Sequence, residues 1–332
     1  MILRYKAAWT QPATFAVLAL VLVTVLVIVP LFGSGYQYRM LTLLFMWVAL
    51  AQAWNLLSGF TGYFSFGHVA FFGLGGYATG ILMARLGWPF PAATAGGSLL
   101  AALFALVIGL GLMRVKGHYF AVASFAVAAA VRELVNNLHF LTGGGMGLQV
   151  PLFPGELLGQ NRFFYFTMLA LAVVTTLTAW LVARSRFGYG LRAIREDEDV
   201  AGALGVNVHV HKLFALVLSA FFVGLAGSIY AYWVTFLEPL DLFNLNYSVN
   251  MVIMPVLGGA GTVAGPVLGA AVVFFLNELF WSFFLELHSA FSGLLLVIVV
   301  LFMPRGLLDF FRSARKSTVV AALKANLQRY GI

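Results

Sequence analysis

The stretch RSRFGYGLRAIREDEDVAGALGVNVHVHK, residues 184–212, is the one long and highly charged segment in a chain that is otherwise mostly apolar. It holds five of the 19 lysine and arginine residues and four of the 11 acidic ones. Hydrophobic runs of membrane-crossing length lie on both sides of it, at 163–183 and 213–234. A charged segment between two such runs must lie in water on one face of a bilayer.

This segment, called the coupling segment below, has a helical pattern. Four apolar residues can share one face: Ile194, Val200, Ala201 and Leu204. The acidic residues 196–199 lie near the other face, and Gly205 ends the pattern as a C-cap glycine would. The pattern alone leaves two interpretations open, a solvated loop or a docking helix for a soluble partner.

The composition indicates an integral membrane protein. Hydrophobic residues make up 62% of the 332 residues and charged residues only 9%, whereas soluble globular chains carry about 25% charged residues. The net charge of +8 does not indicate a nucleic-acid partner, because the basic residues lie in short loops between spans. The chain has no cysteine, which excludes disulfides and thiolate metal sites.

Ten hydrophobic segments predict an all-α, polytopic bundle that forms a single transmembrane domain over residues 1–332. They cover 13–32, 39–57, 67–84, 92–113, 118–137, 161–183, 211–235, 248–257, 265–285 and 289–303. A helix needs about 20 apolar residues to cross the hydrocarbon, so we expect 248–257 to be a half-helix. The first segment is long and lacks a cleavage signal, so we interpret it as a span. Residues 304–332 form a basic tail.

The distribution of basic residues predicts the orientation. With both termini in the cytoplasm, fifteen basic residues lie on the inner side and three, Arg39, Arg85 and Arg162, on the outer side. Short inner loops are rich in lysine and arginine, so this orientation is favoured over its reverse. It also places the coupling segment inside the cell.

Two glycine-rich stretches interrupt the hydrophobic pattern. The first break, residues 58–68, combines aromatic side chains with polar and small residues. The polar and small residues are Ser58, Gly59, Thr61, Gly62, Ser65, Gly67 and His68. It is either a tight inner loop or a non-helical segment that lines the translocation pathway. We favour the pathway, because non-helical backbone inside the membrane is tolerated only where protein buries it or where it lines a water-filled cavity. His68 can instead serve only to cap the helix that follows.

The second break, residues 258–265, mirrors the first in the other half of the chain. Its glycines are Gly258, Gly259, Gly261 and Gly265. Two interrupted hydrophobic segments in corresponding positions predict an internal repeat with the pathway between its halves.

Three charged residues fall inside predicted spans: Arg132, Glu133 and Glu278. Charges inside a membrane are costly and often functional. Arg132 and Glu133 can equally form a structural ion pair. Glu278 can pair with Arg132 or hydrogen-bond within the bundle.

Sequence signals for enzymatic activity are missing. The dipeptide Gly-Lys does not occur, so the chain has no P-loop nucleotide site, and neither H-E-x-x-H nor a plausible G-x-S-x-G is present. The six histidines lack carboxylate partners at ligand spacing, which argues against a metal site. We therefore expect a transport subunit without a cofactor of its own.

Several stretches resemble the permeases of the branched-chain amino-acid ABC importer family, the LivM-like subunits. The first break matches the family pattern G-x-x-G-x-x-S-x-G-H over Gly59–His68, and LGGAGTVAGPVLGA at 257–270 is similar to a second family segment. The run GLRAIREDEDVAGALGVNV at 190–208 resembles the family's loop for the ATP-hydrolysing subunit. Asp199, Val200 and Ala201, followed by Gly205, are a degenerate form of the E-A-A-x-x-x-G loop of importer permeases, with Asp and Val at its first two positions.

The resemblance implies an ATP-driven importer subunit in a bacterial or archaeal cytoplasmic membrane. Partners would be a second permease subunit, two ATPase subunits that use ATP and magnesium, and an extracytoplasmic solute-binding protein. Residues expected to serve ATPase coupling are Arg192, Arg195, Glu196, Asp197, Glu198, Asp199, Ala201 and Gly205. Among the family's solutes we favour branched-chain or related amino acids. The alternative is a self-contained channel or ion-coupled transporter, for which Glu133 and Glu278 are the only candidate ion sites.

Overall fold

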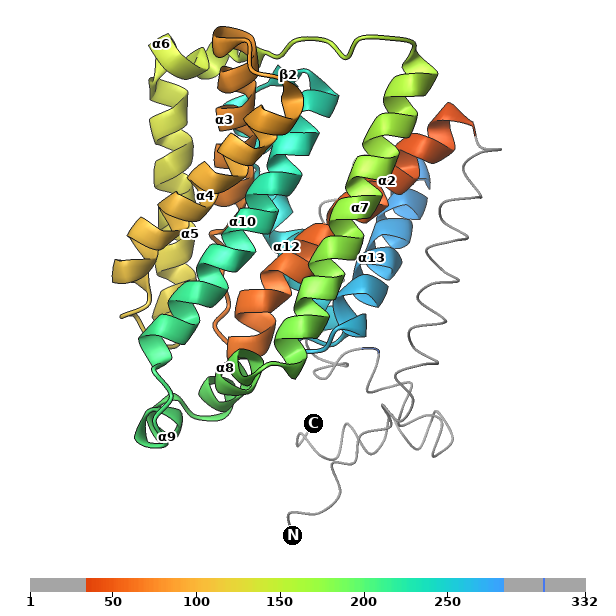
Figure 1. Cartoon of the computed structure of the whole chain (residues 1–332). Coiled ribbons are helices and arrows are strands. Elements are labelled where there is room, and N and C mark those ends of the chain that lie inside the picture. Colours follow the sequence, from red (N-terminus) through yellow and green to blue (C-terminus); the bar gives the residue numbers. More distant parts are fainter. Residues whose placement is uncertain (1–33, 284–306, 308–332) are drawn as a thin grey trace, which may run out of the picture.

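The computed structural model describes residues 34–283 and residue 307, and this part of the chain is mostly helical (Figure 1). Within it, six helices are long and apolar enough to cross a membrane. They are α2 (Gly35–Trp54, continued by a π-helical turn Asn55–Gly59), α3 (His68–Leu86), α4 (Phe90–Leu112), α5 (His118–Asn137), α7 (Leu157–Arg184) and α10 (Val208–Val234). The polytopic all-α prediction is confirmed, while the expected segments at 13–32 and 289–303 and the tail at 304–332 lie outside the described residues.

Two further helices, α12 (Leu245–Gly258) and α13 (Ala264–Phe283), complete the described bundle. Helix α12 has 14 residues, so it is about 21 Å long at 1.5 Å per residue. That is shorter than the bilayer core of about 30 Å, as expected of a half-helix. The chain then turns through the second break into α13, which packs beside α12 and α2 (Figure 1).

The loops at one end of the bundle are partly ordered by small elements. They include α6 (His139–Thr142), a 3₁₀ turn (Gly144–Met146), α11 (Pro239–Leu242) and two short strands, β1 (Leu148–Gln149) and β2 (Phe236–Leu237). The strands pair antiparallel, with Leu148 opposite Leu237. Figure 1 shows this end of the bundle opposite the end that carries α8 and α9.

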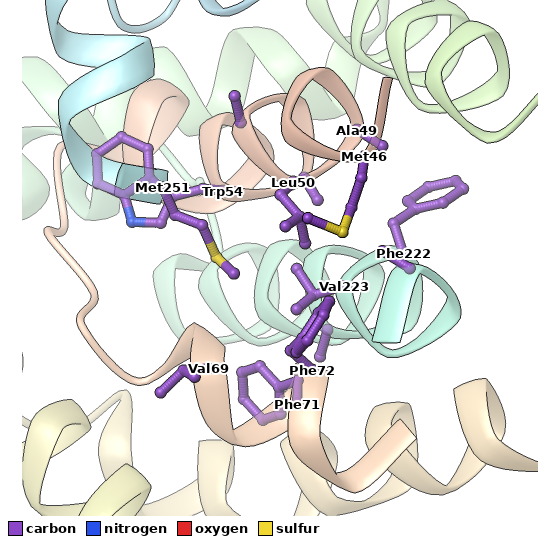
Figure 2. Packing of buried hydrophobic residues seen from close by; sticks show 14 of the residues in the cluster. Met46, Ala49, Leu50, Trp54, Val69, Phe71, Phe72, Phe222, Val223 and Met251 are labelled. Carbon is purple, nitrogen blue, oxygen red and sulfur yellow. The ribbon is translucent and has the colours of Figure 1, made fainter. Parts of the chain in front are cut away.

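The core joins α2, α3, α10 and α12. Figure 2 shows Leu50 and Trp54 of α2 facing Phe72 of α3, Val223 of α10 and Met251 of α12, and all five are buried. Because lipid tails are as apolar as the side chains, the hydrophobic effect does not drive membrane helices together. Close packing of this kind must therefore hold them together.

Glycines allow α3 and α10 to approach backbone to backbone. A Cβ added at Gly227 would overlap the carbonyl oxygen of Phe72, and one at Gly75 would overlap that of Gly224. Small residues at helix crossings of this kind are typical of membrane bundles. The space around Gly111 of α4, in contrast, is open within 4 Å.

We therefore expect Gly227→Ala to destabilise the bundle and Gly111→Ala to be tolerated. Forcing a methyl group into a filled crossing costs roughly 1–3 kcal/mol, because the helices must separate or bend. Thermal unfolding of the two purified variants in detergent measures the difference. Equal melting temperatures for the two variants would contradict the close approach of α3 and α10.

Candidate coupling site and glycine-rich breaks

The coupling segment contains two short helices, α8 (Arg186–Glu196) and α9 (Glu198–Ala203), at one end of the bundle (Figure 1). The expected helical character is confirmed, but the helix is interrupted at Asp197, whose backbone is extended. The Asp197 carboxylate accepts hydrogen bonds from the backbone N–H groups of Asp199 and Val200, both at 2.9 Å. Asp197 is therefore the N-cap of α9.

Gly205 ends α9 as predicted. Its φ of +89° lies in the left-handed region that favours glycine. The Gly205 N–H donates to the Gly202 carbonyl and the Val206 N–H to the Ala201 carbonyl, both at 3.0 Å. These two bonds form a Schellman motif, which satisfies carbonyls at the helix end.

The prediction of one shared apolar face is wrong. Ile194 and Ala201 are buried, but Val200 is 54% exposed and Leu204 is 79% exposed. The extended residue at 197 separates α8 from α9, so a single helical periodicity does not run through both. Val200 and Leu204, four residues apart, thus form an exposed apolar pair on α9, called the α9 pair below.

Glu198 points back into the protein and not toward solvent. Its carboxylate accepts hydrogen bonds from the Tyr63 hydroxyl and from Nζ of Lys212, the latter at 3.0 Å. The Lys212 side chain is fully buried, and its ammonium lies 4.4 Å from the centre of the Tyr63 ring. These contacts fasten α9 to the start of α10 and to the first break.

The pKa of Glu198 reflects this setting. Burial raises the pKa, but hydrogen bonds from Tyr63 and Lys212 and the charges of Lys212 and Lys116 together leave it below its usual value of 4.5. The carboxylate is therefore ionised at neutral pH and balances the buried ammonium of Lys212.

Arg195, in the last turn of α8, connects the coupling segment to both breaks. Its Nη1 donates to the carbonyl oxygen of Gly59 at 2.8 Å and to that of Ala260 at 3.2 Å. Arg192, one turn earlier, stays local: it donates to the carbonyls of Gly188 and Ala183, within α7 and α8. Arg192 and Arg195 thus have different surroundings.

The remaining acids of the coupling segment are exposed. Asp199 forms an ion pair with Lys116 at 2.8 Å in which both side chains are largely in solvent. Glu196 and Asp197 are exposed as well. An exposed ion pair contributes about 0–1 kcal/mol to folding stability, so these surface charges add little to the stability of the fold.

The first break begins where α2 becomes π-helical at Asn55–Gly59, and the chain is non-helical over 62–67. Gly62 has a φ of +77°, which turns the chain toward α3. Ser58, Gly59 and Thr61 are buried, and the Thr61 hydroxyl donates to the carbonyl of Leu57.

His68 is a fully buried polar junction at the start of α3. Its Nε2 lies 2.8 Å from the hydroxyl of Ser219, which itself donates to the carbonyl of Ala53. Nε2 therefore carries the proton, and Nδ1 accepts from the Ser65 hydroxyl at 2.9 Å. The cap of α3 is Gly67, so His68 joins α3 to α10 and, through Ser219, to α2, and does not cap a helix.

The second break is a tight turn between α12 and α13. Gly259 and Gly261 have φ values of +122° and +80°. A Cβ at Gly258 would overlap the carbonyl oxygen of Gly265, and one at Gly269 would overlap that of Met254. These glycines therefore permit the turn and the close packing of the two helices.

Two polar residues, one in α2 and one in the π-helical turn that continues it, bind the second break, and the sequence reasoning missed both. Asn55 accepts from the Gly261 N–H and donates to the carbonyl of Thr262, both at 2.8 Å. Gln52 donates to the carbonyl of Val263 at 2.6 Å. Polar side chains three residues apart in an apolar helix were the available signal, and they place the two breaks in direct contact.

The three predicted intramembrane charges do not form one cluster. Arg132 pairs with the neighbouring Glu133 at 3.1 Å, and both side chains are partly exposed. Glu278 accepts a hydrogen bond from the Tyr36 hydroxyl at 2.9 Å. Of the two alternatives for Glu278, the structure thus shows a hydrogen bond within the bundle. Among the described residues, no group of His, Asp and Glu could hold a metal ion.

Comparison with known proteins matches residues 36–300 to the family described as branched-chain amino acid transport system, permease component. The chain belongs to this family. It is 28% identical over 301 residues to the high-affinity branched-chain amino acid transport system permease protein LivM of Escherichia coli K12, covering 83% of this chain and 70% of LivM. The LivH permease protein of the same organism is 25% identical over 278 residues, which cover 78% of this chain and 90% of LivH.

A more distant relative has a different named role. The autoinducer 2 import system permease protein LsrC of Salmonella paratyphi B is 29% identical over 143 residues, which cover 42% of this chain and 38% of LsrC. The chain is thus a multi-pass permease component of the ABC importer type, and its relatives are named for more than one solute.

Proposed function

We propose that this chain forms the transmembrane pathway for a branched-chain or related amino acid, moved into the cell by ATP hydrolysis in a separate subunit. The α9 pair is the observation that supports an external source of energy. Its two apolar side chains are exposed, next to exposed acidic residues, at the tip of the coupling segment. Arg195 anchors this segment to both breaks. A patch of this kind suits a protein partner in water, and the sequence contains no P-loop motif for a nucleotide.

The proposed topology has ten segments, both termini in the cytoplasm and an internal repeat about the two breaks. The positions of the basic residues support the orientation. Arg114 and Lys116 follow α4 at the end that carries α8 and α9, whereas Arg85 and Arg162 lie at the opposite end. The basic end faces the cytoplasm, where an ATPase can reach the α9 pair.

The proposed assembly contains two permease subunits, two ATPases and a solute-binding protein. The similarity to both LivM and LivH supports a related chain as the second permease subunit. The binding protein would dock at the end formed by α6, β1, β2 and α11, where Glu156, Glu238 and Asp241 lie exposed or partly exposed. Basic edges on that protein would complement these acids.

Reconstituted transport tests this function. We expect proteoliposomes that contain both permease subunits and both ATPases to take up labelled leucine only when ATP and the loaded binding protein are present. Omitting the ATPases should abolish uptake. Uptake by this chain alone, driven by an ion gradient, would replace the proposal with an ion-coupled transporter. The solute itself can be identified by the amino acid that raises the melting temperature of the binding protein.

A further inference from the structure

The guanidinium of Arg195 occupies a site made for it by glycines of the two breaks. A Cβ added at Gly62 would lie 3.1 Å from Cγ of Arg195, and one at Gly261 would overlap its Nη1. Both glycines have positive φ values, +77° and +80°. The backbone of each break therefore turns in a way that leaves room for one side chain from α8.

The two acceptors of Arg195 belong to different halves of the chain. Gly59 ends the π-helical turn of α2, and Ala260 lies in the turn between α12 and α13. One nitrogen atom, Nη1, donates to both carbonyls. A hydrogen bond from a charged donor is stronger than one between neutral groups, so this contact holds both breaks to α8.

The second break is also fastened, without Arg195, to α2 and to the π-helical turn at which the first break begins. Asn55 bonds to Gly261 and Thr262, and Gln52 to Val263. Glu198 adds a bond to Tyr63 in the first break. Within the described residues 34–283, Arg195 adds the hydrogen bond that joins the coupling segment to the second break.

We infer that Arg195 is a positioning residue that transmits movement of α8 to the two breaks at once. This inference rests on the proposed function, in which an ATPase moves α8 and α9. When α8 shifts, the guanidinium either carries the Gly59 and Ala260 carbonyls with it or releases them. In both cases the junction between α2 and α12–α13 changes, and the ATPase need not contact either break.

The variant Arg195→Gln tests the inference, with Arg186→Gln as its control. Glutamine keeps a neutral amide donor but loses the charge and the reach of the guanidinium. Arg186 lies on the same helix, at its first position, and its side chain is exposed. A general effect of removing an arginine from α8 would appear in both variants, whereas loss of transmission would appear only in Arg195→Gln.

The first readout is the number of solute molecules imported for each ATP hydrolysed in proteoliposomes. We expect this ratio to fall about tenfold in Arg195→Gln, the effect of losing a hydrogen bond to a charged donor, while ATPase binding and hydrolysis persist. Arg186→Gln should keep the ratio, and Arg195→Lys should recover part of it. A parallel loss of ATPase binding and uptake, or an unchanged ratio, would overturn the inference.

The second readout does not depend on transport. Hydrogen exchange of the backbone amides at 259–263 should become about tenfold faster in Arg195→Gln and stay unchanged in Arg186→Gln. Unchanged exchange in Arg195→Gln would overturn the inference even if transport fails. Faster exchange together with ion-driven uptake in the absence of ATPases would overturn the proposed function and leave the link between α8 and the second break intact.

Discussion

Replacing both Val200 and Leu204 with aspartate should abolish stable association of the ATPase while leaving the permease folded. The two side chains are 54% and 79% exposed, so the substitutions remove little from the core. Fully burying a Val or Leu side chain is worth about 1.5–3 kcal/mol, so a partner that covers both gains binding free energy that the aspartates remove. The new charges would in addition be desolvated in any remaining contact.

The experiment measures co-purification of the ATPase with the membrane-inserted permease and the melting temperature of the permease alone. The matched control is Leu152→Asp, because Leu152 is 73% exposed in the loop at the opposite end of the bundle. The double variant should lose the ATPase without a change in melting temperature, and the control should keep it. Undiminished co-purification by the double variant would show that the α9 pair is not the docking surface.

The location of the coupling segment could be predicted from the sequence, because a charged segment between two apolar runs of membrane-crossing length must lie in water. The direction of its side chains could not. A helical wheel assumes one continuous helix, and the extended backbone at Asp197 breaks that assumption. As a result Val200 and Leu204 are exposed, and Glu198, which the sequence grouped with exposed acids, faces Lys212.

The glycine-rich breaks were found from composition, but their mutual contact was not. Glycine spacing indicates where two backbones can approach each other, but it does not identify the helix or turn that approaches. The bonds of Asn55 to Gly261 and Thr262 join residues more than 200 positions apart. Only the folded chain reveals such a pair, as it reveals the two carbonyls that meet Arg195.

The ion pair between Glu198 and Lys212 should carry the largest stability effect of any single contact in the coupling segment. Lys212 is fully buried and Glu198 retains 16% of its side-chain exposure. Removing one member of a buried pair leaves an uncompensated charge, which costs roughly 3–5 kcal/mol. We expect Glu198→Gln to lie near the lower end of this range, because water reaches part of the carboxylate.

A double-mutant cycle separates the pair from its surroundings. Lys212→Met removes the ammonium but keeps an unbranched chain of similar length, so the Glu198→Gln, Lys212→Met double variant should recover much of the lost stability. Thermal and denaturant unfolding of the four proteins gives the coupling energy. Additive losses, with no recovery in the double variant, would mean that Glu198 and Lys212 do not depend on each other.

The same pair predicts how stability depends on pH. The pKa of Glu198 is lower in the folded protein than its usual value of 4.5, so the folded state favours the ionised carboxylate. Its contribution is therefore complete above about pH 4.5 and is lost as the pH falls through the lowered pKa. The difference in melting temperature between the wild-type protein and Glu198→Gln should be constant near neutral pH and shrink in acid, because protonation turns Glu198 into a neutral group like glutamine. A difference that grows as the pH falls would mean that the folded protein raises the pKa of Glu198, and the ion pair with Lys212 would then not be what stabilises the junction of α9 with α10.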